Sequence, residues 1–101
     1  MAICIRITKC REVDGIHVYQ VRKIDFEDPY EFYVALSAGK KIISFYSDPE
    51  LKNLLKATNF DDPNETIGVP GIPAMIVGCV LRKCLEAIDN NYFPESMGYY
   101  A

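Results

Sequence analysis

The chain has 101 residues, of which 50% are apolar and 25% charged, and its formal net charge is −3 at pH 7. This size and composition predict one globular domain over residues 1–101 and argue against a membrane span or a disordered chain. The acidic balance gives no general attraction to phosphate groups, so we expect neither nucleic acid nor a membrane as a partner.

The N-terminal residues do not form an export signal, because Arg6 interrupts the only apolar stretch there. A cytoplasmic location is therefore expected. The four cysteines, Cys4, Cys10, Cys79 and Cys84, are then predicted to be reduced thiols.

Alternating apolar and polar side chains predict four strands in the first half of the chain, over residues 2–9, 16–26, 30–36 and 41–46. The first two are joined at Asp14-Gly15, a pair that favours a tight turn. In the second strand the phase changes after Val18, which indicates either a bulge or a strand covered on both faces. The short connections favour an antiparallel meander.

A short helix is expected over residues 49–57. Ser47 and Asp48 are suitable capping residues, Pro49 suits a first helical turn, and three leucines would form the buried side. Residues 59–73 contain several prolines and glycines and should be irregular. Such a length is unusual for a connection in a small domain and suggests a functional segment.

Apolar residues then recur at helical spacing, which predicts a second helix over residues 73–90. A buried strand over 74–81 is the alternative, since Gly78 weakens a helix there. The aromatic tail, residues 91–101, should dock on the body or meet a partner. The predicted fold class is α+β, a four-stranded antiparallel meander followed by two helices packed on one sheet face (ββββαα).

No motif for catalysis, cofactor binding or metal binding stands out. His17 is the single imidazole, and a Cys/His/Asp arrangement with Asp14 lacks any surrounding signature. Cys79 and Cys84 are five positions apart, so on a helix they point about 140° apart and cannot share a zinc ion. We therefore predict no catalytic residues, cofactor or metal ligands.

Asp61, Asp62 and Glu65 lie in a segment that resembles a calcium-binding loop only in part, because Ile67 replaces the required glycine and Pro73 the last ligand. A solvated acidic loop is the better interpretation. Its charge would attract a basic partner.

Tyrosines suggest a second candidate surface. If alternate residues of the third strand face the helices, Tyr33 faces the other way, and Tyr46 with either Tyr19 or His17 would lie beside it. Tyrosine and histidine on an open sheet face are typical of protein interfaces, although tyrosine is also common in strands without a binding role.

These features favour a small, acidic, cytoplasmic protein-binding domain, of the kind that inhibits or confers immunity by covering a basic macromolecular partner. A homodimer through the open face or an edge strand is one form of this hypothesis. The alternatives are a small enzyme that uses a cysteine or His17, and a small-molecule binder with a pocket beside residues 59–73.

Overall fold

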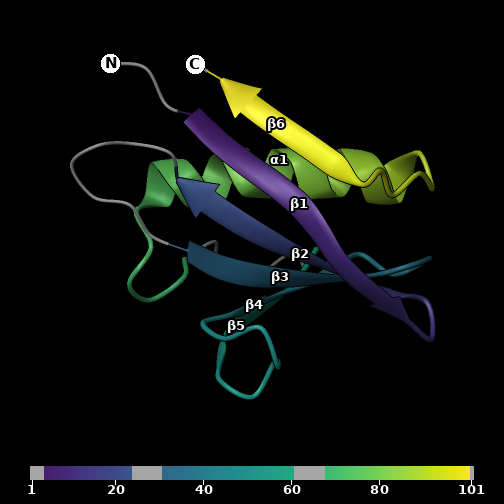
Figure 1. The fold of residues 1–101 in the computed structure, drawn as a ribbon, viewed down its shortest axis with the longest axis horizontal. Coiled ribbons are helices and arrows are strands. Elements are labelled where there is room, and N and C mark those ends of the chain that lie inside the picture. The colour runs from purple at the N-terminus through teal and green to yellow at the C-terminus, as the bar shows by residue number, and fades with distance from the viewer. Residues whose placement is uncertain (1–3, 24–30, 61–67, 101) are drawn as a thin grey trace.

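A computed structural model describes residues 4–23, 31–60 and 68–100. These residues form a six-stranded antiparallel sheet with the order β5-β4-β3-β2-β1-β6, and one helix that crosses a single face of it (Figure 1). The elements are β1 (Cys4–Val13), β2 (Ile16–Lys23), β3 (Glu31–Ser37), β4 (Ile42–Tyr46), β5 (Leu54–Asn59), α1 (Ala74–Asp89) and β6 (Ser96–Tyr100).

The predicted ββββαα arrangement is wrong in its second half. Strands β1 to β4 form the expected meander, but the helix expected over residues 49–57 is absent. A turn and strand β5 occupy that part of the chain, and the tail supplies β6, which pairs antiparallel with β1. The sheet is therefore extended by one strand at each edge.

Asp48 explains why the first expected helix does not form. Its carboxylate accepts hydrogen bonds from the backbone N–H of Lys52, at 3.0 Å, and of Asn53, at 2.8 Å. The N–H of Ser47 donates to the carbonyl of Asn53 at 3.1 Å, which closes the segment into a compact turn. Leu51 has a φ of 60° there, far from the helical value of about −63°. The capping group is present, but it closes a turn instead of starting a helix.

The helix predicted over residues 73–90 is confirmed as α1, and the alternative strand is excluded. Pro73 precedes it with a φ of −57° and Asn91 follows it in the left-handed region, with a φ of 49°. One side of the helix is buried, and the residues on it are Ile76, Val77, Val80, Leu81, Cys84, Ala87 and Ile88. No helix in the described part of the chain is long and apolar enough to cross a membrane.

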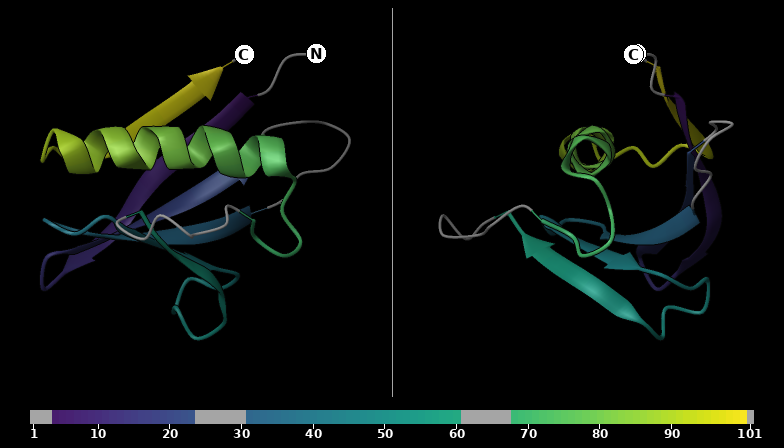
Figure 2. Two further views of the ribbon diagram at one scale, coloured as in Figure 1. Left: turned by 180° about the vertical axis from the view of Figure 1, so that it is seen from behind. Right: turned by 90° about the vertical axis from the view of Figure 1, so that its left-hand side faces the viewer.

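The core lies between α1 and the sheet, which curves around the helix (Figure 2). Side chains that point from the sheet toward α1 are fully buried, including Ile5, Ile7, Tyr19, Val21, Val34, Leu36, Ile43 and Phe45. Each such aliphatic or aromatic side chain contributes about 1.5–3 kcal/mol by leaving water. This packing fixes α1 against the sheet.

The change of apolar phase in the second strand is explained by burial on both faces of β2. A bulge lies between Lys9 and Arg11, while β2 alternates regularly, with His17 and Tyr19 on the helix side. Val18 points to the opposite side of the sheet, called the outer face below, yet it is only 2% exposed. At this point β2 is covered on both faces, which was the second of the two explanations that the sequence suggested.

Candidate functional site

The predicted aromatic patch is only partly assembled. Tyr33 and Tyr46 are cross-strand neighbours on the outer face, as expected. Tyr19 and His17 are buried on the helix side, where they cannot join that patch. Tyr33 is itself only 6% exposed, so its ring offers a partner little free surface. The predicted acidic residues Asp61, Asp62 and Glu65 lie outside the described residues.

Tyr33 belongs to a polar cluster on the outer face. Its hydroxyl donates to Glu31 Oε1, and Gln20 Nε2 donates to the same oxygen at 2.7 Å. The hydrogen bond from Tyr33, supported by that from Gln20, lowers the pKa of Glu31, and the bond to Glu31 raises the pKa of Tyr33. The hydroxyl of Tyr33 is thus already engaged within the fold.

Residues 92–95, the last part of the segment between α1 and β6, are called the connector. Three successive backbone carbonyls of the connector accept hydrogen bonds from β1 and β2. Lys9 Nζ donates to Phe93 O at 3.0 Å, and the Tyr19 hydroxyl donates to Pro94 O at 2.6 Å. The backbone N–H of Lys9 donates to Glu95 O at 2.8 Å. These bonds fix the start of β6 relative to the helix.

His17 packs against the same connector. Its ring stacks on Phe93 with centroids 3.8 Å apart and an interplanar angle of 4°. Burial lowers the pKa of the imidazole, opposed by Glu12, whose Oε1 lies 3.5 Å from Nε2. The Nδ1 atom has no hydrogen-bond partner among the described residues. A neutral, packed imidazole results.

Neither Cys10 nor Cys84 is activated as a nucleophile. Cys10 is an exposed residue at the β1 bulge, and partial desolvation of its thiol raises the pKa of that thiol. Burial raises the pKa of Cys84 to about 12. Both thiols are therefore protonated near pH 7, where a nucleophilic cysteine needs to be a thiolate. Within the described ranges, no group of three or more His, Cys, Asp and Glu side chains is placed to hold a metal ion.

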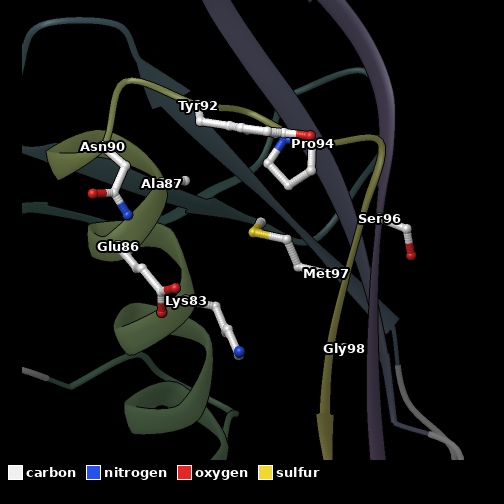
Figure 3. A pocket seen from close by; sticks show the side chains of 9 residues that line it. All are labelled: Lys83, Glu86, Ala87, Asn90, Tyr92, Pro94, Ser96, Met97 and Gly98. Atoms are coloured by element: carbon white, nitrogen blue, oxygen red, sulfur yellow. The ribbon is translucent and has the colours of Figure 1, made fainter.

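A groove lies between the second half of α1 and β6 (Figure 3). Its volume is about 440 Å³. Met97 points from β6 toward the helix, and Tyr92 extends across one end of the groove. Lys83 and Glu86 line the helix side. The groove thus combines apolar contact surface with one cation and one anion.

Strand β6 is the outermost strand on this side of the described sheet. The hydrogen bond from Lys9 N to Glu95 O fixes which backbone groups of β6 face β1, because an antiparallel ladder alternates between bonded and non-bonded pairs. By this alternation Met97 and Tyr99 bond to β1, while Ser96, Gly98 and Tyr100 direct their N–H and C=O groups to the open edge. That edge can accept another strand.

The two edges of the sheet differ in protection. At the β5 edge, the register with β4 shifts next to Tyr46, and β5 carries Lys56. Irregular pairing and lysine are features that discourage an edge from pairing with another chain. Strand β6 has no charged residue, no proline and no register shift. It is the edge better suited to strand addition.

The sequence patterns did not predict this site. The five residues of β6 contain a central glycine, and their alternation is too short to stand out. The aromatic content of the tail predicted that it docks on the body or meets a partner, and its pairing to β1 agrees with the first alternative. Comparisons with models of protein families, with curated proteins and with solved structures found no match.

Proposed function

We propose that this protein is a binding domain that takes up an extended segment of another protein as an additional strand beside β6. The observation that carries this proposal is an unprotected strand edge that directly adjoins a groove with apolar and charged walls. In strand addition, backbone hydrogen bonds supply affinity, and pockets for alternate side chains supply specificity.

Each part of the site has a separate task. The open backbone groups of Ser96 and Gly98 would pair with the bound segment. Its side chains on the helix side would enter the groove, contacting Met97 and Tyr92, with Lys83 and Glu86 within reach of polar groups. The connector holds these parts together, so the site needs no large rearrangement to accept a segment.

A domain that covers a segment in this way hides it from other proteins, which is how an inhibitor of the kind inferred from the sequence would act. A cytoplasmic setting fits the unpaired thiols of Cys10, Cys79 and Cys84. The prediction that the partner is basic rests on Asp61, Asp62 and Glu65, and the β6 site does not depend on it.

A proline substitution at the open edge tests the proposal. Nine-residue peptides selected from a random display library against the full chain serve as probes, and their dissociation constants are measured by fluorescence anisotropy. Ser96→Pro should weaken binding at least tenfold, because it removes an N–H that the segment needs, whereas Ser96→Thr keeps it and should stay within about twofold. The N–H of Ser96 makes no bond to β1, so the fold tolerates the proline.

Two results would contradict the proposal. Peptide binding that is equally strong in Ser96→Pro, together with unchanged amide hydrogen exchange at Ser96 and Gly98 of the wild-type chain when the peptide binds, would remove β6 from the site. A dimer seen by sedimentation equilibrium, and dissolved by Ser96→Pro, would assign the edge to a second copy of this chain instead of another protein.

A further inference from the structure

A row of side-chain positions crosses the outer face from the open edge inward. Cross-strand pairing aligns Gly98 with Arg6, Arg6 with Arg22, and Arg22 with Glu31. Arg22 Nε lies 3.9 Å from Glu31 Oε2. Arg6 is exposed and has no carboxylate partner among the described residues.

Two arginines directly opposite each other destabilise a ladder, because like charges repel at this short spacing. Glu31 offsets the charge of Arg22. The charge of Arg6 is left without such compensation, one strand away from the open edge. No contact among the described residues accounts for an arginine at this exposed position.

Gly98 lies between Arg6 and the open edge. Any other residue there would place a side chain on the outer face, between the guanidinium and an added strand. Adjacent strands are about 4.8 Å apart, and an arginine and a carboxylate side chain can span a strand that has no side chain between them. The absence of a side chain at Gly98 therefore leaves Arg6 accessible from the edge.

We infer that the segment bound along β6 carries an aspartate or glutamate opposite Gly98, whose carboxylate pairs with Arg6 across the glycine. This inference rests on the proposed function and specifies the chemistry of the partner. An arginine and a carboxylate can form two parallel hydrogen bonds, which fixes the register of the bound segment as well as adding affinity.

The same geometry disfavours a second copy of this chain as the occupant. Antiparallel pairing of two β6 strands about Gly98 would place the two glycines opposite each other. Arg6 of each copy would then face Arg6 of the other, with no carboxylate between them. An acidic segment of a different protein would bring a carboxylate to Arg6, whereas self-pairing would bring a second arginine toward it.

Charge reversal at Arg6 provides the test. The random nine-residue library is selected in parallel against the full wild-type chain and the Arg6→Glu variant. Wild-type binders should be enriched in Asp or Glu at one position of an alternating pattern, and Arg6→Glu binders in Lys or Arg at that position. The variant should bind the wild-type consensus peptide about tenfold more weakly, and a peptide with Lys at that position should restore the affinity.

Arg11→Glu is the matched control. Arg11 is also an exposed arginine of β1 but lies beyond the bulge, paired with Val18 instead of a β6 residue. Arg11→Glu changes the net charge by the same amount as Arg6→Glu, but it should alter the affinity for the peptide by no more than about twofold. Equal effects of the two variants would show only a general attraction between charges and would overturn the inference.

The inference and the proposed function can fail separately. Peptides that lose affinity in Ser96→Pro, but show no acidic preference and no specific response to Arg6→Glu, would overturn the pairing with Arg6 and leave strand addition intact. Peptides whose binding is unaffected by Ser96→Pro would overturn both.

Discussion

His17 shows how a single polar residue can serve packing. The imidazole is 7% exposed, stacked on Phe93, and approached by Glu12 and Lys9. Burial lowers its pKa below the ordinary value of 6.5. The unfolded chain therefore binds a proton at a higher pH than the folded chain does, and stability falls as the solution is acidified.

We expect the free energy of unfolding to decrease between pH 7.5 and pH 5 partly because His17 becomes protonated. His17→Phe keeps a stacked ring and removes the titrating group, so its stability should depend less on pH over this interval. Urea denaturation of both proteins at several pH values measures the difference. The carboxylates with lowered pKa, Glu31 and Asp48, titrate at lower pH and remain in both proteins. Parallel curves for the two proteins would show that folding does not lower the pKa of His17.

Tyr19 shows why residue type alone did not predict on which face of the sheet a tyrosine lies. A tyrosine was expected to lie on an open face, but its ring is fully buried and its hydroxyl reaches the carbonyl of Pro94. Burial of a tyrosine is favourable when its hydroxyl finds an acceptor, and that acceptor lies 75 positions away in the sequence. No local pattern contains this information.

At the scale of the elements, α1 was predictable because its apolar residues repeat over four turns. Strand β5 was not, since leucines at positions 51, 54 and 55 fit a short helix equally well. The strand is favoured by the turn that Asp48 closes and by pairing with β4, a tertiary interaction that outweighs weak local preference. The same holds for β6, which is defined by its pairing with β1.

The C-terminus of α1 offers a test of local conformation. Asn91 has a φ of 49° and donates its N–H to the carbonyl of Ile88 at 3.1 Å, which ends the helix. Asparagine tolerates this left-handed conformation better than alanine does. Asn91→Ala should lower the free energy of unfolding by about 1 kcal/mol, and Asn91→Gly should leave it unchanged or raise it.

Thermal or urea unfolding of both Asn91 variants checks this expectation. Asn90→Ala is the control, because Asn90 has a φ of −88° that alanine adopts without strain. A larger loss from Asn90→Ala than from Asn91→Ala would contradict the assignment of strain to the left-handed residue.

The fold of the whole molecule depends on one hydrophobic core, and the exposure of Cys84 indicates whether that core is intact. This thiol lies fully buried on the side of α1 that faces the sheet, and burial raises its pKa to about 12. Because α1 packs over the sheet as a unit, we expect Cys84 to be exposed only when the whole domain unfolds.

In a chain with Cys4→Ser, Cys10→Ser and Cys79→Ser, a thiol reagent should modify Cys84 at a rate set by global unfolding. The ratio of this rate to that of a model thiol should match the unfolding equilibrium constant from urea denaturation. In the complementary variant, Cys84 is replaced by serine and Cys10 is retained. The reagent should modify Cys10 rapidly in the folded state. Fast modification of Cys84 under native conditions would show that α1 detaches by itself.

The pairing of β1 with β6 has a consequence for biosynthesis. Translation proceeds at roughly 5–20 residues per second, so β6 leaves the ribosome on the order of ten seconds after β1. Throughout that interval the growing polypeptide presents β1 with one side bare. A chaperone that shields unpaired strand edges would have this side of β1 to bind until β6 has been made.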